Sequence, residues 1–295
     1  MHGIINIDKP LGITSMDVVR KIRQATGVKK VGHGGTLDPM ASGVIPVGIG
    51  NATRILEYIV LYDKSYIAHI YLGESTDTFD SEGHIVNTNG TPPNDSGLID
   101  KTLNEFRGEI MQTPPPYSAI KKNGTRLYEL ARRGQDTYID PRKAIVHELK
   151  IRKSSPPILE LFGRCGKGFY VRSLANDLGI TLGCGGYIKD LRRTAVGKFD
   201  ITNSITLPKA LITIENGDAS DIIQPMGMCL NNFKRVDLST EETNMIRNGQ
   251  KIPYKEIYIT PRQSLAAAFE PKGALAAIIM FEDKSCEWKP VKVFR

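Results

Sequence analysis

The segment Val31-Gly32-His33-Gly34-Gly35-Thr36-Leu37-Asp38-Pro39 places a single carboxylate in a run of residues rich in glycine. Its three glycines have no Cβ, so they permit positive φ and a close approach of other groups to the main chain. Pro39 favours an extended backbone at Asp38 and removes one amide donor. The apolar run 44–49 that follows predicts a buried strand. An acid on a tight loop beside a rigid strand is typical of a functional site, but an ordinary Asp-Pro turn explains this spacing about equally well.

The composition indicates a globular protein with one large domain and a small one. The chain has 295 residues, of which 40% are hydrophobic and 24% charged, which argues against disorder. No apolar stretch reaches the length of a membrane span and no signal peptide is evident, so we expect a cytoplasmic protein without a membrane partner. The four cysteines are far apart and predict reduced thiols. The five histidines lack the spacing of metal ligands, so no metal site is expected.

The charges are unevenly distributed along the chain. Residues 117–153 carry ten Lys or Arg against four Asp or Glu, a net charge of +6, whereas residues 73–109 have a net charge of −6. Three tyrosines lie within the basic block, a combination that fits a surface for phosphates and unstacked bases. The alternative is a solvated helical face. The concentration of the basic block, with a pI near 9.1, favours a polyanionic partner.

Hydrophobic periodicity and capping residues predict alternating strands and helices as far as residue 214. Strands are expected at 3–7, 44–49, 64–72, 145–151, 158–163 and within 191–201. Helices are expected at 53–60, 99–106, 126–133, 171–178 and 208–214. A further helix should begin at the N-cap Ser15 and end at Gly27.

The pattern of predicted elements changes near residue 230. A helix capped by Ser239 and short strands at 264–270, 273–281 and 288–294 suggest a small appended barrel. The junction Asn231-Asn232 is polar, so we expect few apolar contacts to cross it and the tail to be separable.

Four other features each allow two interpretations. Residues 114–121 are either a linker or a rigid edge that faces RNA. Arg172, where a strand gives way to a helix, can pair bidentately with a carboxylate such as Asp38 or can be a surface arginine. Tyr66 on a predicted strand is either a core residue or a platform for a stacked ligand. The segment 191–193 provides either phosphate contacts or exposed charge.

Taken together and in order, these motifs resemble the TruB family of bacterial tRNA pseudouridine synthases, which isomerise uridine 55 of the tRNA T-loop. The matching segments are Asp8-Lys9-Pro10-Leu11-Gly12, Gly32 to Pro39, Lys64-Ser65-Tyr66, Thr76-Asp77-Thr78 with Asp80 and Gly83, Pro115 to Lys121, Gly124, Tyr128 to Arg132, Gly168 to Arg172 and Leu191 to Gly197. The tail resembles a PUA domain through Gly249, Gly273 to Ile278 and Lys289 to Phe294. Thr194 departs from the pattern, because family members often carry an apolar residue there.

The resemblance implies an α+β fold in two domains. Residues 1–232 should form a pseudouridine-synthase domain with a mixed, largely antiparallel central sheet flanked by helices, including a basic RNA-binding region at about 109–153. Residues 233–295 should form a PUA-like β-barrel that binds RNA. The implied partner is the T-arm of tRNA, bound by a monomer that needs no other protein.

The resemblance also assigns the site. Asp38 is the catalytic residue and Arg172 its ion-pair partner. Tyr66 stacks on the target base with its hydroxyl near C5, and His33 helps to hold the T-loop open. Three further residues are assigned to the pocket: Lys9, Tyr170 and Leu191.

The implied reaction breaks the N1–C1′ bond, turns the uracil and joins C5 to C1′. The product is an isomer and no redox change occurs, so neither a metal nor an organic cofactor is required. An ionised carboxylate suffices, and an ordinary aspartate is ionised at neutral pH. Attack on the base, attack on the sugar and proton abstraction all remain open.

Two functions of other classes remain as alternatives. The first is a non-catalytic RNA-binding protein on the same scaffold, against which the presence of Asp38, Tyr66 and Arg172 argues. The second is a synthase that depends on a guide RNA and partner proteins, as in the archaeal and eukaryotic relatives. Activity of the isolated chain on an unmodified tRNA would separate all three.

Overall fold

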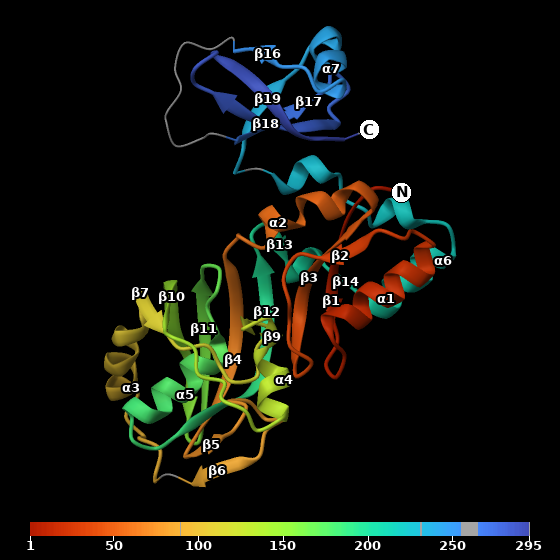
Figure 1. Ribbon diagram of the computed structural model, residues 1–295. Coiled ribbons are helices and arrows are strands. Elements are labelled where there is room, and N and C mark those ends of the chain that lie inside the picture. Colours follow the sequence, from red (N-terminus) through yellow and green to blue (C-terminus); the bar gives the residue numbers. More distant parts are fainter. Residues whose placement is uncertain (89, 231, 255–264, 295) are drawn as a thin grey trace.

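The protein is described here from a computed structural model, which covers residues 1–295 except 89, 231, 255–264 and 295. Two sheets organise the chain, a large one below and a small one above in Figure 1. No helix among the residues covered is long and apolar enough to cross a membrane.

The large sheet has ten strands: β1 (Gly3–Lys9), β2 (Val31–His33), β3 (Ala41–Ile49), β4 (Lys64–Leu72), β7 (Gly108–Gln112), β10 (Arg142–Ser155), β11 (Ile158–Cys165), β12 (Gly186–Val196), β13 (Phe199–Asp200) and β14 (Ile205–Thr206). Their order is β14-β1-β3-β12-β4-β11-β10-β7, with β2 beside β3 and β13 beside β12. Only the pairs β1–β14 and β3–β12 are parallel. The expected mixed, largely antiparallel sheet is therefore confirmed, and β12 lies between two strands that are consecutive in sequence.

Helices pack against both ends of this sheet (Figure 1). Near β1 and β14 lie α1 (Ser15–Thr26) and α6 (Leu207–Glu215), which share a buried apolar cluster with β1 and β3. Near β10 and β11 lie α3 (Ser96–Leu103) and α5 (Val171–Thr181), which contribute to a second cluster with β4. The short α4 (Leu127–Arg132) follows a small hairpin of β8 (Lys121–Lys122) and β9 (Thr125–Arg126), and a second hairpin joins β5 (Glu74–Thr76) to β6 (Ile85–Thr88).

The expected first and second helices need correction. The N-cap of α1 is Thr14, which forms a capping box with Asp17, and not Ser15, whose hydroxyl faces the interior. Gly27 ends α1 in the left-handed region as predicted, with φ 66°. The segment expected as a helix at 53–60 is instead the 3-10 helix η1 (Gly50–Ile55) followed by the four-residue α2 (Leu56–Ile59).

The tail forms a curled five-stranded sheet, as expected for a PUA-like domain. Its strands are β15 (Lys234–Asp237), β16 (Ile252–Pro253), β17 (Leu265–Phe269), β18 (Leu275–Glu282) and β19 (Glu287–Val293), in the order β15-β17-β18-β19-β16. The helix α7 (Thr240–Arg247) is capped by Ser239 as predicted. Residue 264, at the start of one predicted strand, and residue 231 of the junction lie outside the described residues.

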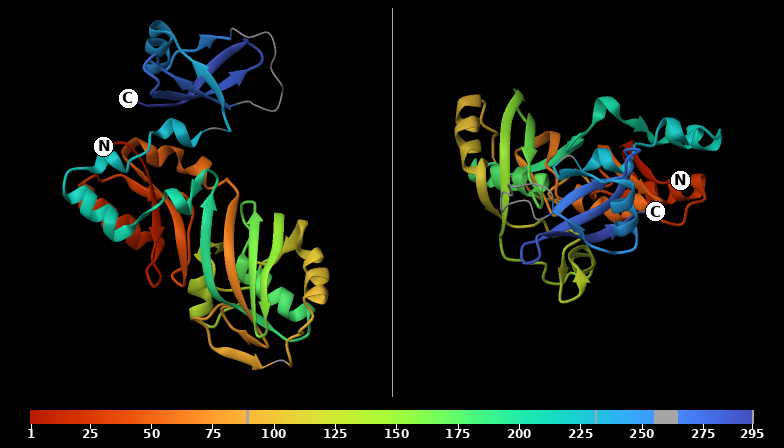
Figure 2. Two further views of the ribbon diagram at one scale, coloured as in Figure 1. Left: turned by 180° about the vertical axis from the view of Figure 1, so that it is seen from behind. Right: turned by 90° about the horizontal axis from the view of Figure 1, so that it is seen from above.

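The expectation that few apolar contacts cross the junction is wrong. One buried cluster joins side chains from η1, α2, β12 and β13 to side chains of the tail: Ala52, Ile55, Leu56, Ile59, Val196 and Phe199 with Ala267, Phe269, Leu275, Ile278 and Phe294. Arg54 lies over the ring of Phe294 at 5.0 Å and donates to the carbonyl of Val293. Lys292 pairs with Glu57. The two sheets are separate in the left view of Figure 2, but they share a core.

Candidate active site

Asp38 lies in the loop between β2 and β3, and its side chain is 35% exposed. Arg172, in the first turn of α5, reaches it from the other half of the sheet, with 3.0 Å between Arg172 Nε and Asp38 Oδ2. The Arg172 side chain is only 7% exposed. The expected ion pair is present, and the Asp38 side chain remains partly exposed beside a largely buried guanidinium.

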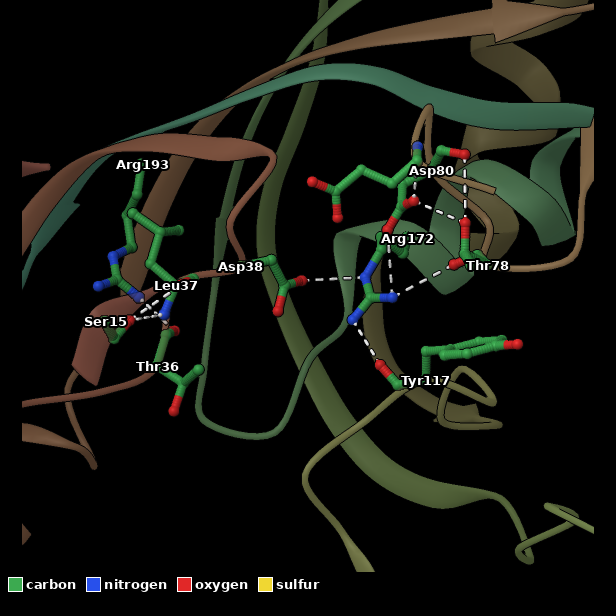
Figure 3. Close-up of polar contacts among 10 residues, drawn as sticks. Ser15, Thr36, Leu37, Asp38, Thr78, Asp80, Tyr117, Arg172 and Arg193 are labelled. Atoms are coloured by element: carbon green, nitrogen blue, oxygen red, sulfur yellow. Dashed lines mark hydrogen bonds and ion pairs between the residues drawn. The ribbon is translucent and has the colours of Figure 1, made fainter. Parts of the chain in front are cut away.

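Arg172 also binds groups from two other loops (Figure 3). Its Nη1 lies 3.3 Å from Asp80 Oδ2 and donates to the carbonyl of Thr78, while its Nη2 donates to the carbonyl of Tyr117 at 2.9 Å. The guanidinium therefore joins two carboxylates and does not pair bidentately with Asp38. The four contacts of the guanidinium with three segments of the chain fix the direction from which it approaches Asp38.

Asp80 lies in a segment that matches the family, but it was not predicted as a residue of the site. The Asp80 carboxylate is buried and accepts hydrogen bonds from the hydroxyl of Thr78 at 2.6 Å and the amide of Glu82 at 3.1 Å. Burial raises the pKa of Asp80, and the hydrogen bond from Thr78 and the charge of Arg172 oppose that rise. The Thr-x-Asp spacing in the acidic segment was the available signal, because a hydroxyl two residues away can satisfy a buried carboxylate.

The backbone next to Asp38 is held from α1. The buried hydroxyl of Ser15 accepts from the amide of Leu37 at 2.8 Å and donates to the carbonyl of Leu37 at 2.9 Å. The carbonyl of Asp38 accepts from the amide of Ala41 at 3.1 Å. The aspartate therefore projects from an ordered turn.

Lys9, expected in the pocket, lies beneath this loop. Its side chain has no exposed surface, and Nζ donates to the carbonyls of Pro10 and Ile13 at 2.8 Å and of Pro39 at 3.5 Å. Burial lowers the pKa of Lys9 to about 8, although the charge of Asp38 opposes the shift. Lys9 thus contributes to the site through the backbone that it supports.

Tyr66 and Leu191 come from adjacent strands of the same sheet. Tyr66 on β4 lies partly buried opposite Arg193 of β12 and borders a small apolar pocket. Burial raises the pKa of Tyr66 to about 12, so its hydroxyl is protonated at neutral pH. Leu191 is buried in the same apolar cluster as Leu37.

His33 and Tyr170 lie on the two segments that carry Asp38 and Arg172. The Nδ1 of His33 accepts from the amide of Gly35 at 3.4 Å. Burial and the charge of Arg193 lower the pKa of His33, which favours a neutral imidazole. The backbone of Tyr170 both donates to and accepts from the side chain of Gln112, at 2.8 and 3.0 Å.

The prediction for Arg193, a phosphate contact or exposed charge, is wrong. Arg193 is 1% exposed and donates to the carbonyls of Val44, Thr36 and Gly35 at 2.7, 3.0 and 3.1 Å. Successive residues of a strand face opposite sides. The neighbouring Arg192 therefore points away and pairs with Asp8 at 2.7 Å.

The basic block begins at the site and extends away from it. Its first residue, Tyr117, provides the carbonyl that Arg172 binds. Beyond it, Arg126 and Arg132 lie over the ring of Tyr128 at 5.8 and 5.7 Å, and both arginines are exposed. The part of the basic block that follows Tyr117 therefore carries exposed cations and an aromatic ring.

Three family models together match nearly the whole chain. Residues 23–171 match the TruB family pseudouridylate synthase (N terminal domain). Residues 172–231 match the tRNA pseudouridylate synthase B C-terminal domain, and residues 233–295 match the tRNA Pseudouridine synthase II, C terminal model.

Similar proteins and structures cover the same length. A protein of Dehalococcoides mccartyi named tRNA pseudouridine synthase B is 42% identical over 294 residues, which are 100% of this chain and 97% of that protein. One of Clostridium kluyveri with the same name is 43% identical over 295 residues, covering 100% of both. A solved structure of an H/ACA RNP bound to a substrate RNA containing 2′-deoxyuridine is similar with a TM-score of 0.76 and 26% identity, covering 99% of this chain and 85% of that one. A Cbf5-Nop10-Gar1 complex gives a TM-score of 0.74 and 26% identity, covering 99% and 84%.

Proposed function

We propose, on the premise that this chain belongs to the TruB family of pseudouridylate synthases and is a tRNA pseudouridine synthase, that its target is uridine 55 of the T-loop and that Asp38 is its catalytic residue. The observation that carries the role of Asp38 is its ion pair with a buried arginine at 3.0 Å. A carboxylate paired in this way is held in one orientation while its side chain remains partly exposed.

The reaction places three demands on the residues around Asp38. The target uridine must leave the RNA stack, at a cost of a few kcal/mol. The carboxylate must meet the exposed nucleoside in one direction, which its contact with Arg172 and the hydrogen bonds of its loop provide. The flipped base needs a surface to stack on, which we assign to Tyr66, whose hydroxyl is protonated at neutral pH.

The remaining assignments concern how the tRNA is held. We assign His33, Tyr170 and Leu191 to the pocket and Lys9 to the support of its floor. The basic region at about 109–153 would bind the backbone of the T-arm, because its exposed arginines and Tyr128 suit phosphates and bases.

We divide the chain into a catalytic domain, 1–232, and a PUA-like RNA-binding domain, 233–295. The separate sheets and the boundary between the family models at 231 and 233 support this division. We further propose that the enzyme acts in the cytoplasm as a monomer and needs no other protein.

A synthase that depends on a guide RNA is the second candidate, because the similar solved structures include an H/ACA RNP and a Cbf5 complex. Identity to those chains is 26%, whereas identity to proteins named tRNA pseudouridine synthase B exceeds 40% over the full length. The comparison favours activity of the chain alone.

The test is release of tritium from an unmodified tRNA transcript labelled at C5 of its uridines. We expect the purified chain alone, in EDTA, to release one equivalent of tritium, and a transcript with cytidine at position 55 to release none. Release only after addition of a guide RNA or partner proteins would support the second candidate.

Asp38→Asn should abolish release and leave tRNA affinity unchanged, because the amide keeps the shape of the side chain and removes its charge. Asp218→Asn, at an exposed position remote from the site in sequence, is the matched control and should behave as wild type. Turnover by Asp38→Asn within tenfold of wild type would overturn the role of Asp38.

A further inference from the structure

The loop that carries Asp38 is held by its carbonyl groups. Each carbonyl from residue 35 to residue 39 accepts a hydrogen bond: those of Gly35 and Thr36 from Arg193, that of Leu37 from Ser15, that of Asp38 from the amide of Ala41, and that of Pro39 from the amide of Gly12. The donors belong to β12, α1, the start of β3 and the turn after β1. Five successive peptide groups are thus fixed from separate parts of the chain.

Arg193 provides two of these five bonds, and its burial is costly. It is among the largest fully buried side chains, and within the described part of the chain it makes no ion pair with a carboxylate. A buried charge without a counter-ion costs several kcal/mol, which charge-assisted hydrogen bonds offset only in part. A buried apolar side chain would fill this space without that cost, so the guanidinium serves something other than stability.

The geometry matches a guanidinium and no other side chain. Nη1 and Nη2 donate to the carbonyls of two consecutive residues, Thr36 and Gly35, while Nε donates to Val44 of the adjacent strand. A planar fork of this kind fixes both the position and the orientation of the peptide that it binds, whereas a lysine can only place one charge. Arg193 therefore fixes the start of the loop against β3.

The close packing of β3 and β12 allows the Arg193 side chain to reach the loop that carries Asp38. Gly43 of β3 is paired with Arg193 of β12, and a Cβ at Gly43 would lie 2.1 Å from the carbonyl oxygen of Arg193. The φ of Gly43, 110°, is one that other residues rarely adopt. The glycine at position 43 of β3 therefore allows β12 to lie close to β3 beside the loop.

We propose that Arg193 is a positioning residue for pseudouridine formation, which holds the Gly35–Thr36 backbone so that Asp38 meets the flipped uridine between Arg172 and Tyr66. The inference rests on the proposed role of Asp38. The Arg193 side chain is shielded from solvent, donates to carbonyls of the loop and of β3, and also lies beside the Tyr66 hydroxyl, so it acts through the residues of the site and not on the uridine itself.

The primary test compares Arg193→Gln and Arg193→Lys in single-turnover assays with saturating enzyme. Misplacement of a reacting group by about 1 Å costs about a hundredfold in rate. We expect a loss of about that size for Arg193→Gln and about tenfold for Arg193→Lys, which retains the charge and one anchoring bond. The KM and the dissociation constant for tRNA should stay within about twofold of wild type.

A matched control removes another arginine that binds a backbone carbonyl outside this loop. Arg107 donates to the carbonyl of Leu149 through Nε and Nη2, at 3.1 and 2.8 Å. Arg107→Gln should therefore keep the wild-type rate. A rate loss in Arg107→Gln equal to that of Arg193→Gln would overturn the proposal, because it would mean that any lost anchor slows the reaction.

A second arm keeps the test decisive if Arg193→Gln does not fold. Ser15→Ala releases the same loop from α1 with a change of one oxygen atom, so it should also lower the rate at unchanged tRNA affinity. Because both side chains act on one loop, the loss in Ser15→Ala/Arg193→Lys should be smaller than the product of the single losses. Wild-type rates in both single variants, or losses confined to KM, would overturn the proposal. An active Asp38→Asn variant would instead refute the proposed function.

Discussion

Three buried cations contact the loop that carries Asp38, and each binds a different part of it. Arg172 binds the carboxylate of Asp38, Arg193 binds the backbone before it, and Lys9 binds the backbone after it. Only the first contact was predictable from sequence, because a pairing of opposite charges is recognisable by residue type alone. Every residue has a backbone carbonyl, so a cation that binds carbonyls has no partner that the sequence identifies. Arg193 therefore looks like any charged residue until the structure shows that it lies on a buried face of its strand.

The buried amine of Lys9 makes stability depend on pH. Its pKa falls from 10.5 to about 8 in the folded protein. Below pH 8 the amine is protonated in both states and the cost of burying its charge is fully present. Between pH 8 and 10.5 the unfolded chain binds the proton and the folded chain does not, so the free energy of unfolding rises with pH.

The contribution of Lys9 to the pH dependence of the free energy of unfolding can be measured by urea denaturation of wild type and Lys9→Met from pH 7 to pH 10. We expect the difference in the free energy of unfolding between them to shift in favour of wild type by about 2 kcal/mol over this range. Titration of the cysteines and tyrosines occurs in both proteins and cancels. Exposed Lys21→Met is the control and should show no such shift. A constant difference between wild type and Lys9→Met would show that Lys9 keeps its ordinary pKa.

At the level of elements, the site depends on the insertion of β12 between β3 and β4. The parallel pair β3–β12 carries Leu191 and Arg193 to the Asp38 loop, and the antiparallel pair β12–β4 places Arg193 opposite Tyr66. The sequence predicted the six longer strands of the large sheet from hydrophobic patterning, but not the short strands β2, β7, β13 and β14. It did not predict this order, because strand order depends on contacts between residues about 150 positions apart.

Local errors in the prediction have a related cause. Ser15 and Thr14 are both good N-cap residues, and the sequence alone does not show that the Ser15 hydroxyl binds Leu37 and leaves Thr14 as the cap. Likewise, the polar pair Asn231-Asn232 in the sequence gave no sign of the apolar cluster that the two parts of the chain share. Each error concerns a tertiary partner, whereas the types of the elements follow from local patterns.

Gly43 provides a test of the contact between β3 and β12. Gly43→Ala puts a methyl group against the carbonyl of Arg193, so it should be strongly destabilising. Gly217→Ala is the matched control, because Gly217 has a similar φ, 92°, with no atom within 4 Å of an added Cβ. We expect Gly217→Ala to cost about 1 kcal/mol and Gly43→Ala about 3 kcal/mol more, measured by urea denaturation. Equal losses in the two variants would mean that the strands separate easily at this point.

At the scale of the whole molecule, the shared core makes the two sheets depend on one another. Phe269 of β17 is 6% exposed and packs in the cluster that includes Ile55 and Val196. Truncation after residue 232 would uncover the apolar side chains of η1 and α2, so it should lower the stability of the catalytic domain. The expectation of a freely separable tail is replaced by that of a single cooperative unit.

The single tryptophan allows a direct measurement of this coupling. Trp288 lies buried in the tail, so its fluorescence reports on the small sheet while far-UV circular dichroism reports on the whole chain. We expect the two signals to change together in urea, and Phe269→Ala to lower both midpoints together by the equivalent of about 3 kcal/mol. Ile212→Ala, at an exposed position on α6, should leave both midpoints unchanged. Separate transitions would show that the halves unfold independently.

The insertion of β12 also sets the order in which a ribosome can complete the enzyme. Asp38 emerges early, but Arg172 and Arg193 are synthesised when more than half of the chain has been made, and β1 gains its parallel neighbour β14 later still. Domains generally fold as units while synthesis proceeds from the N-terminus. A nascent chain shorter than 172 residues therefore carries Asp38 without either arginine. The ion pair of Asp38 with Arg172 and the anchoring of its loop by Arg193 can therefore form only late in synthesis.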